Sequence, residues 1–217
     1  FSRRFYEDNG FFLKNGGLEI CRKDDDARWE ELKRKVSSGK AFGTNVSLIS
    51  AAEAKEKFPL LDEESIRGAM WDPDAGLVTP RSQDVVSFAV ETAKDKGALR
   101  TFTDTPAVDF EVENDRIVGV KTDKGTIKTN KVVIASGIWG PLMGKKAGVP
   151  VPLMPLEHPL LFFGPLPEAQ GAEDFLVYPL LRDQGNSAYV RDTGRLHGGM
   201  LEWGFYEDKN PRLVDPE

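Results

Sequence analysis

The sequence predicts an α+β fold, in which a mixed β-sheet with flanking helices is joined to a β-meander and a buried strand. Helix-like and strand-like segments alternate between residues 11 and 100. Short alternating segments follow from 107 to 134, a pattern typical of a meander. Beyond residue 150 the chain is rich in proline and aromatic residues, which indicates strands separated by fixed turns.

The composition is typical of a soluble globular protein. Of the 217 residues, 40% are hydrophobic and 29% are charged, which is enough for one sizeable core or two small domains. The net charge is −6 and basic clusters are short, so we expect no nucleic-acid partner. No apolar run approaches the ~20 residues of a membrane-spanning helix, so we expect no membrane partner.

Cysteine and histidine usage limits the compartment and the metal chemistry. Cys21 is the single cysteine and has no disulfide partner, which fits a reducing compartment, and we expect a cytoplasmic location. His158 and His197 are far apart in the sequence and have no thiol partners, so we expect no metal site.

The first elements are predicted from glycine positions and helical spacing. Residues 11–21 indicate two short strands around a glycine turn. Residues 25–38 have apolar side chains at spacings of three and four, which predicts a helix closed by Gly39. A short strand is expected over 46–49.

Two further helices have clear start signals. Ser50 and Glu53 form a capping-box sequence, so a helix should begin there and end before Pro59. A strand is predicted over 66–71. The next helix is expected to have Thr79 as N-cap, Pro80 at its first position, Gly97 after its last turn, and a buried stripe of Val86, Ala89, Val90 and Ala93.

The meander leads into a β-branched segment with small residues after it. Turns are expected at 113–115 and 124–125. Residues 132–134 predict a strand buried on both faces, and residues 135–137 would then allow close approach of a ligand. A helix from Pro141 to Gly148 should follow. This segment fits a dinucleotide site or an ordinary buried strand and turn equally well. A final hairpin is predicted from residues 189–190 and 196–201.

Several motifs, in a fixed order, resemble those of a known family. They are residues 12–20, Leu48-Ile-Ser-Ala-Ala-Glu53 with 58–61, Asp74-Ala-Gly76, 117–125, 132–149 and 152–158. This series is similar to the flavin oxidoreductases of the dimethylglycine oxidase, dimethylglycine dehydrogenase and sarcosine dehydrogenase group, within the D-amino-acid-oxidase-like superfamily. The resemblance runs from Phe11 to Trp203.

One hallmark of that family does not occur in the sequence. Family members begin with a strand–turn–helix carrying Gly-x-Gly-x-x-Gly, whose backbone binds pyrophosphate, and the histidine that anchors flavin covalently in this group lies in the same region. The resemblance therefore implies an internal fragment. Residues 1–100 would begin the substrate-side domain, 101–149 would be part of an FAD-binding domain with the meander and strand, and 150–217 would supply substrate-domain strands.

The resemblance also implies a cofactor and its contacts. We expect FAD in the full-length protein and no FAD on this fragment alone, which should be inactive. The meander residue Ala107 would lie against the adenine, and the end of the following strand would pass close to the dinucleotide. That second contact comprises Ala135, Ser136, Gly137 and the aromatic Trp139.

The implied chemistry is oxidation of a C–N bond by hydride transfer to flavin, with an N-methylated amino acid as substrate. A substrate carboxylate needs a cation, and Arg182 and Arg191 are the candidates. His158 and Tyr189 are the candidate catalytic residues, and Tyr178 could also contact the amine. Relatives commonly have tyrosine where this chain has Leu160, which cannot form a hydrogen bond with the substrate.

Other functions share this architecture. A D-amino-acid or glycine oxidase and a glycerol-3-phosphate dehydrogenase-like enzyme are alternatives, as is a non-catalytic ligand-binding domain without flavin. The expected partners are a small amine or amino-acid substrate and the N-terminal FAD-binding segment of the parent chain. Exposed apolar surface around Ile138, Trp139 and Leu142 would also favour self-association.

Overall fold

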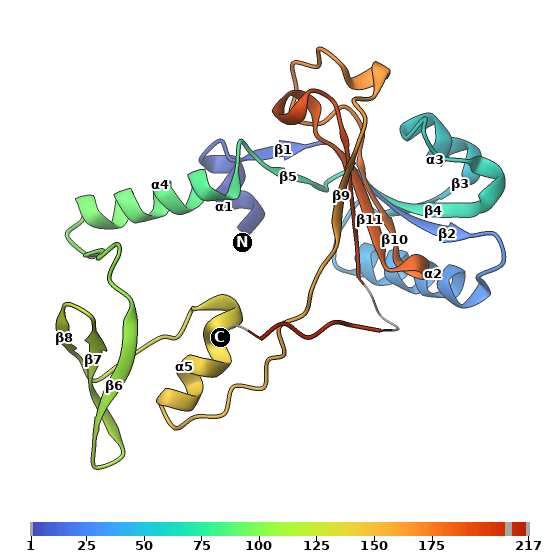
Figure 1. The fold of residues 1–217 in the computed structure, drawn as a ribbon. Helices are drawn as coiled ribbons and strands as arrows, with labels where there is room; N and C mark the ends of the chain where they lie inside the picture. The colour runs from blue at the N-terminus through green and yellow to red at the C-terminus, as the bar shows by residue number, and fades with distance from the viewer. Residues whose placement is uncertain (1, 207–209, 216–217) are drawn as a thin grey trace. The chain divides into compact units, whose positions relative to one another are not determined.

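The computed structural model describes residues 2–206 and 210–215. The chain divides into two compact units: residues 1–90 with 158–209, and residues 91–157 with 210–217. Helices and several sheets alternate along the chain, which confirms the mixed α/β class (Figure 1). The assignment of each part to substrate or flavin stays a prediction.

A seven-stranded mixed sheet forms the centre of the first unit, in the order β3-β4-β2-β10-β11-β12-β9. The β2–β10 pair is parallel, and the other neighbouring pairs are antiparallel. The strands are β2 (Gly17–Arg22), β3 (Ser47–Ser50), β4 (Ile66–Asp72), β9 (Leu160–Phe163), β10 (Leu180–Asp183), β11 (Ala188–Asp192) and β12 (Leu201–Phe205).

The two strands predicted around a glycine turn are confirmed, although they join different sheets. β1 (Phe12–Lys14) pairs with β5 (Gly76–Val78), and β2 lies in the large sheet. Gly16 between them has φ of +78°, and a Cβ atom there would overlap the ring of Trp71. The turn therefore requires glycine. A short helix, α1 (Ser2–Asp8), precedes β1.

The second helix, α2 (Asp26–Ala41), begins as predicted and ends later than predicted. Its N-cap Asp25 accepts a hydrogen bond from the Arg28 backbone at 2.9 Å. The predicted closure at Gly39 is wrong, because the helix continues through that residue. A side chain at position 39 would overlap Val46 and Thr44, so this glycine allows close packing rather than ending the helix.

The capping-box prediction is confirmed in α3 (Ala51–Lys57). The Ser50 hydroxyl accepts from the Glu53 amide at 3.2 Å, and the Glu53 carboxylate accepts from the Ser50 amide at 2.7 Å. The helix ends at Lys57 with Phe58 as its C-cap, directly before Pro59, as predicted. A 3-10 turn, η1 (Glu63–Ser65), then leads into β4.

The start and the buried face of α4 (Ser82–Asp95) were predicted wrongly. The helix begins at Ser82, two residues after Pro80, so Thr79 is not its N-cap and Pro80 is not its first residue. No side chain of α4 is buried, and Val86 is 62% exposed. Phe88 forms the contact stripe instead, with ring centroids 6.3 Å from Phe5 and 5.3 Å from Phe11. One large aromatic ring outweighs the small alanines in choosing the packed face.

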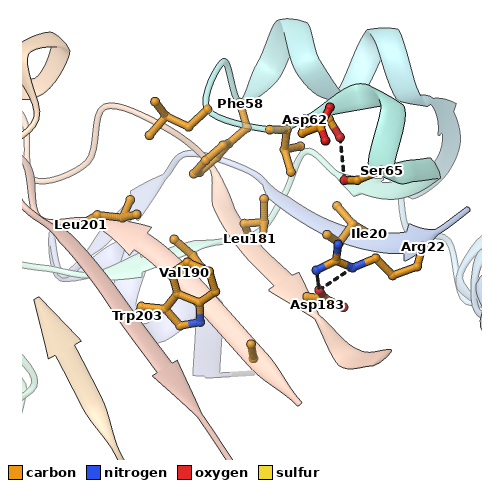
Figure 2. Close-up of a pocket in the computed structure, with 13 residues that line it drawn as sticks. Ile20, Arg22, Phe58, Asp62, Ser65, Leu181, Asp183, Val190, Leu201 and Trp203 are labelled. Atoms are coloured by element: carbon orange, nitrogen blue, oxygen red, sulfur yellow. Dashed lines mark hydrogen bonds and ion pairs between the residues drawn. The ribbon is translucent and has the colours of Figure 1, made fainter. Parts of the chain in front are cut away.

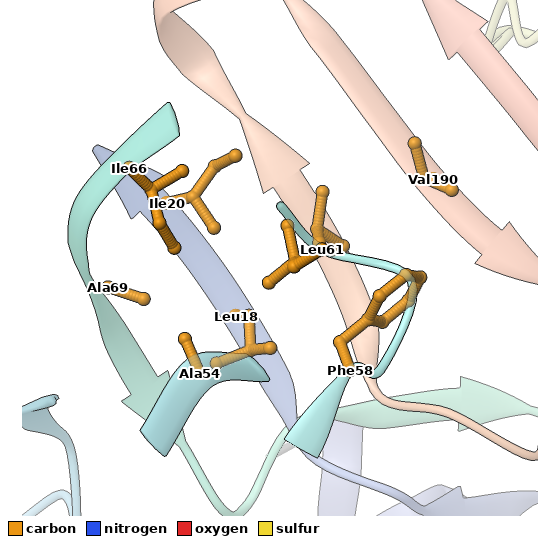
Figure 3. Packing of buried hydrophobic residues seen from close by; sticks show 9 residues of the cluster. Leu18, Ile20, Ala54, Phe58, Leu61, Ile66, Ala69 and Val190 are labelled. Carbon is orange, nitrogen blue, oxygen red and sulfur yellow. The ribbon is translucent and has the colours of Figure 1, made fainter. Parts of the chain in front are cut away.

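The core of the first unit lies on one face of the large sheet. α3 lies on that side of strands β3, β4 and β2, and α2 covers their other side (Figure 1). Figure 3 shows how the apolar side chains of α3 and the loop after it meet those of the strands. The cluster comprises Leu18, Ile20, Ala54, Phe58, Leu61, Ile66, Ala69, Leu181 and Val190.

The predicted meander is confirmed in the second unit as β6 (Ala107–Glu113), β7 (Arg116–Thr122) and β8 (Gly125–Lys128). Asn114 and Asp115 have φ of 49° and 59°, as a two-residue turn of this hand requires. The helix predicted after the small residues is also confirmed. It is α5 (Gly140–Lys146), preceded by the 3-10 turn η2 (Gly137–Trp139).

The buried strand predicted over residues 132–134 is not formed. These residues have no regular structure, and Val133 is 90% exposed. A strand needs partners for its backbone N–H and C=O groups, and no described segment pairs with this one. The β-branched composition of the segment was therefore not sufficient to predict a strand.

The predicted final hairpin forms between β11 and β12, which pair antiparallel, but the second strand was placed too early: only Leu201 of the predicted segment 196–201 belongs to it. Its second strand starts at Leu201, because the residues before it form the 3-10 turn η5 (Gly194–His197) and two glycines with positive φ. The other 3-10 turns of this part are η3 (Pro167–Ala169) and η4 (Gln184–Asn186), the second of which directly follows β10. Among the described residues, no helix is both long and apolar enough to cross a membrane.

Candidate active site

Four strands of the large sheet bring three of the predicted site residues, Arg182, Tyr189 and Leu160, into one row. In the register, Arg182 on β10 lies opposite Tyr189 on β11, Tyr189 opposite Gly204 on β12, and Gly204 opposite Leu160 on β9. Directly opposed residues point to the same face of a sheet. Arg191 lies two residues from Tyr189 and shares that face. The face is the one opposite the apolar core.

The two predicted catalytic residues are in contact. Nε2 of His158 lies 3.0 Å from the Tyr189 hydroxyl. The rings of His158, Tyr189 and Tyr206 form an aromatic cluster, with centroids 4.4 Å apart for His158–Tyr206, 5.8 Å for His158–Tyr189 and 6.2 Å for Tyr189–Tyr206. Tyr206 was not predicted from the sequence. It could have been found from its position: it follows β12 directly and lies two residues after Gly204, so its side chain is expected on the same face of the sheet.

Gly204 fixes the position of the Tyr189 ring. A Cβ atom at residue 204 would overlap ring atoms of Tyr189, so the ring occupies the space that a side chain would fill. Burial raises the pKa of Tyr189 above its ordinary value, and the nearby carboxylate of Glu202 raises it further. The phenol is therefore neutral near neutral pH and can both donate and accept a hydrogen bond.

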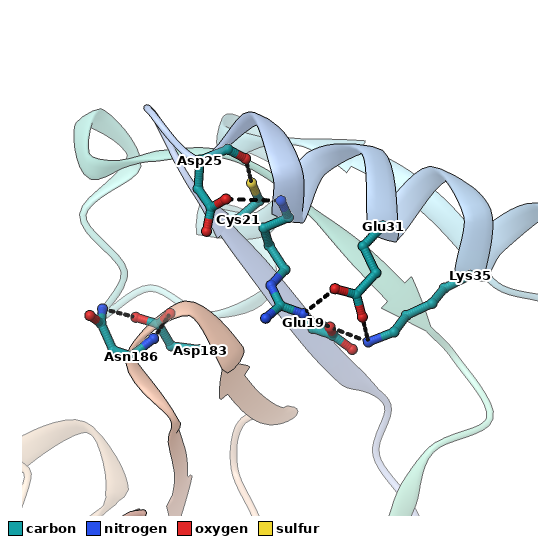
Figure 4. A network of polar contacts seen from close by, with 8 residues as sticks. Glu19, Cys21, Asp25, Glu31, Lys35, Asp183 and Asn186 are labelled. Atoms are coloured by element: carbon teal, nitrogen blue, oxygen red, sulfur yellow. Dashed lines mark hydrogen bonds and ion pairs between the residues drawn. The ribbon is translucent and has the colours of Figure 1, made fainter. Parts of the chain in front are cut away.

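The two candidate arginines differ in availability. Nη2 of Arg191 lies 2.6 Å from Oε2 of Glu202, whose side chain is largely buried. Arg182 is exposed, and among the described residues its guanidinium has no ion-pair partner. Glu19, which lies opposite Arg182 on β2, is bound instead by Lys35 at 2.6 Å (Figure 4).

A cavity of about 260 Å³ adjoins Arg182 on this face. Its wall includes the β2 and β4 residues Glu19, Met70 and Asp72, together with Leu180, so two carboxylates accompany the one guanidinium. The free guanidinium is the cationic group of this wall. A small anionic group entering the cavity would meet Arg182 before any other cation.

Tyr178 does not join this group. Its ring packs on Phe58, with centroids 5.4 Å apart, and lies against the apolar core. Burial raises its pKa, and the carboxylate of Glu168 raises it further. His197 contacts Phe162 edge-on, with centroids 5.7 Å apart, at the other end of β9.

The core-side face of the sheet carries a different cavity, of about 200 Å³ (Figure 2). Apolar side chains such as Phe58, Leu181 and Trp203 line it. At one end Nε and Nη2 of Arg22 donate to Oδ2 of Asp183 at 3.0 and 2.8 Å. Because that arginine is already paired and none of the predicted site residues lines the cavity, this face offers no comparable anion site.

The predicted flavin contacts lie in the second unit. Ala107 is exposed at the start of β6. The Ser136 hydroxyl is buried and has no hydrogen-bond partner among the described residues. Gly137 has φ of +55°, and the space beside its α-carbon is open. Trp139 is half exposed. The Ser136 hydroxyl lacks a hydrogen-bond partner, and the neighbouring Gly137 leaves room for a ligand to approach the backbone. Both features are compatible with contact to one side of a dinucleotide. No group of residues suited to hold a metal ion occurs in the described part of the chain.

Comparison with protein-family models gives one match over the whole chain. The model is described as DAO, FAD dependent oxidoreductase, and it matches residues 1–217. Human mitochondrial sarcosine dehydrogenase is 32% identical over 95% of this chain, and rat mitochondrial dimethylglycine dehydrogenase is 27% identical over 91%. The chain spans 22% of the length of each of these relatives.

A solved structure with a similar fold is L-proline dehydrogenase from P. horikoshii. It superposes with a TM-score of 0.79 at 30% sequence identity, over 99% of this chain and 54% of that protein. Both mammalian relatives are mitochondrial, so the expected cytoplasmic location stays a prediction. The expected self-association is likewise untested.

Proposed function

Because this chain belongs to the DAO family of FAD-dependent oxidoreductases, we propose that it is the substrate-side portion of an enzyme that oxidises N-methylated amino acids of the sarcosine or dimethylglycine type. The observation that carries the proposal is the row on one sheet face, where an unpaired arginine lies directly opposite Tyr189, which contacts His158. In this assignment residues 1–100 and 150–217 belong to the substrate-binding domain, and residues 101–149 belong to the FAD-binding domain.

Arg182 is the carboxylate-binding residue of the proposal. A guanidinium binds a carboxylate through two parallel hydrogen bonds, which also orients the substrate. Arg191 is less suited, because its charge is already balanced by Glu202 at 2.6 Å. Its ion pair with Glu202 joins β11 to β12, the two strands that carry Tyr189 and Gly204.

Tyr189 and His158 contact the amine in this proposal. The substrate nitrogen must lose its proton before a neighbouring C–H can be oxidised. The imidazole of His158, in hydrogen-bond contact with the Tyr189 hydroxyl, provides a path for that proton. Leu160 lies opposite Gly204 on the neighbouring strand β9. Its apolar side chain would exclude water from the N-methyl groups of the substrate.

The residues that would hold FAD in this chain are Ala107, Ala135, Ser136, Gly137 and Trp139. The chemistry that FAD supplies when bound is acceptance of a hydride equivalent from the carbon next to the amine nitrogen. The unsatisfied Ser136 hydroxyl would gain a hydrogen bond there, and the open backbone at Gly137 allows close approach. The sequence has no Gly-x-Gly-x-x-Gly, so we expect weak FAD binding by residues 1–217 alone.

The test is anaerobic flavin bleaching by the full-length parent protein with sarcosine, dimethylglycine, glycine and D-alanine. The proposal expects bleaching by the N-methylated pair. An Arg182→Gln variant should raise KM at least tenfold, since it removes a charge-assisted contact. Arg34→Gln, an exposed change on α2, is the matched control.

Bleaching by glycine or D-alanine alone would replace this proposal with a glycine or D-amino-acid oxidase. A colourless parent protein that gains no flavin on reconstitution would support the non-catalytic alternative.

A further inference from the structure

Strand β9 (Leu160–Phe163) forms one outer edge of the seven-stranded sheet. It pairs with β12 on one side, and no described segment pairs with its other side. All four residues are apolar and between 43% and 46% exposed, although their side chains alternate between the two faces of the sheet. The strand therefore has accessible apolar surface on both faces and an open backbone edge.

The hydrogen-bond pattern identifies the backbone groups on that open edge. The amide of Phe205 donates to the carbonyl of Pro159 at 3.3 Å, which marks a hydrogen-bonded position of the β9–β12 ladder. Such positions recur at every second residue of an antiparallel pair, so the backbone groups of Leu161 also face β12. Leu160 and Phe162 therefore direct their N–H and C=O groups away from the sheet.

β9 lacks most of the features that keep strand edges from pairing. Natural edges commonly carry charged side chains, bulges or an internal proline. β9 has no charged residue, its pairing with β12 runs in one unbroken register, and the nearest prolines, Pro159 and Pro165, lie outside it. An incoming strand would therefore meet neither charge repulsion nor an interrupted backbone.

We propose that β9 is a dimerisation edge, which pairs antiparallel with β9 of a second copy about a two-fold axis at Leu161. In this register Leu160 of each copy lies opposite Phe162 of the other, and each such pair exchanges both of its open backbone hydrogen bonds. The large sheets of the two copies then form one continuous sheet. Because the contact is isologous, it closes on itself and gives a dimer rather than a filament.

The chemistry of the edge favours an identical strand as its partner. On one face of the joined sheet Leu160 lies beside Phe162 of the second copy, and on the other face the two Leu161 side chains meet. Every apolar side chain thus gains an apolar neighbour. A partner recognised through charge would find no charged group on β9 to contact. Since the strand has only four residues, we expect a weak dimer.

The test is a charge exchange at Leu161, measured by sedimentation equilibrium of the 217-residue protein. Leu161→Lys and Leu161→Glu each place like charges at the two-fold axis, so each variant alone should raise the dimer Kd at least about tenfold. An equimolar mixture of the two variants should restore dimers, because opposite charges then face each other. Leu153→Lys changes another exposed leucine, outside β9, and should leave the Kd unchanged. Circular dichroism checks that each variant is folded.

Several results would overturn the proposal. One is a 217-residue protein that stays monomeric at about 1 mM. Dimers that persist in both single variants would place the association at another surface, such as that around Trp139. Single variants that remain monomeric when mixed would contradict the two-fold axis at Leu161.

The full-length parent protein supplies a further check. The proposal expects its dimers to show the same loss and the same restoration. A monomeric parent, together with a dimeric 217-residue protein, would assign the edge of β9 to another segment of the parent and would overturn the proposal. None of these measurements depends on flavin or on substrate oxidation, so they are separate from the test of the proposed function.

Discussion

The fully buried carboxylate of Asp192 holds the chain at Tyr178, whose backbone amide donates to Oδ2 at 2.8 Å. Oδ1 of the same carboxylate accepts from Val177 at 2.8 Å and from Gly194 at 2.9 Å. One side chain at the end of β11 thus fixes both the segment that enters β10 and the turn that follows β11. The geometry of Arg182 and Tyr189 depends on this junction.

Replacement of Asp192 should destabilise the first unit strongly. Asp192→Ala leaves the amides of Val177, Tyr178 and Gly194 without this partner, and the Gly194 contact is buried while the other two are partly buried. A buried unsatisfied donor costs about 1–3 kcal/mol and a partly buried one less, so we expect a loss of at least about 2 kcal/mol. Urea denaturation followed by tryptophan fluorescence measures the change. Asp123→Ala, in an exposed turn, should change stability little. A loss below about 1 kcal/mol for Asp192→Ala would contradict the role given to this carboxylate.

A side chain at position 204 should displace the Tyr189 ring. Gly204→Ala places a methyl group where ring atoms of Tyr189 lie, so we expect about 1–3 kcal/mol of destabilisation and loss of the Tyr189–His158 contact. Thermal unfolding and the NMR signals of the His158 ring measure the two effects. Gly140→Ala is the control, because a Cβ there meets its nearest neighbour at an ordinary 3.6 Å. Unchanged His158 signals in the Gly204 variant would refute the expectation.

The capping box of α3 should give the protein an acid-sensitive component of stability. Hydrogen bonds from the Ser50 backbone and then its side chain lower the pKa of Glu53 below its ordinary value. A carboxyl whose pKa falls on folding stabilises the protein above its unfolded pKa, and that stabilisation is lost as the pH falls through the folded pKa. Ser50→Ala should cost about 1 kcal/mol near neutral pH and less in acid. Denaturation curves at both pH values test this; an equal cost at the two values would contradict it.

Tyr189 should titrate late in alkaline solution. Its pKa is raised on folding, so the neutral phenol stabilises the folded state below the unfolded pKa, and this stabilisation disappears as the pH rises through the folded pKa. Phenolate absorbance should therefore show a late phase from Tyr178 and Tyr189. Tyr189→Phe should reduce the amplitude of the late phase. A late phase of unchanged amplitude would assign the shift to another tyrosine.

Local signals in the sequence were sufficient for several elements. The capping box at Ser50 and the turn at Asn114–Asp115 depend on residues within four positions of one another, and both were predicted correctly. The face of α4 was not, because it depends on contacts of Phe88 with Phe5 and Phe11, far away in the sequence. The strand predicted over 132–134 failed for the same reason. A strand requires a neighbouring strand to pair with, and the β-branched pattern does not specify one.

The sequence offered candidate site residues but not their arrangement. Amino-acid chemistry was implied by the family resemblance, and the register of four strands decides which of the arginine, tyrosine and histidine candidates meet. That register opposes Arg182 to Tyr189 and leaves Tyr178 on the core. The pairing of Arg191 with Glu202 and the glycine beneath Tyr189 were likewise missed, because neither carries a local sequence signal.

The parallel pairing of β2 with β10 has a consequence for the order of folding during synthesis. It joins residues 17–19 to residues 180–182, and Arg22 to Asp183, so the sheet cannot be completed until the chain has been made to that point. Until then β2 has β4 on one side and an open edge on the other. Such long-range pairing slows folding and prolongs the exposure of unpaired strand edges. On the ribosome, the first half of this unit must therefore wait, only partly folded, for strands made more than a hundred residues later.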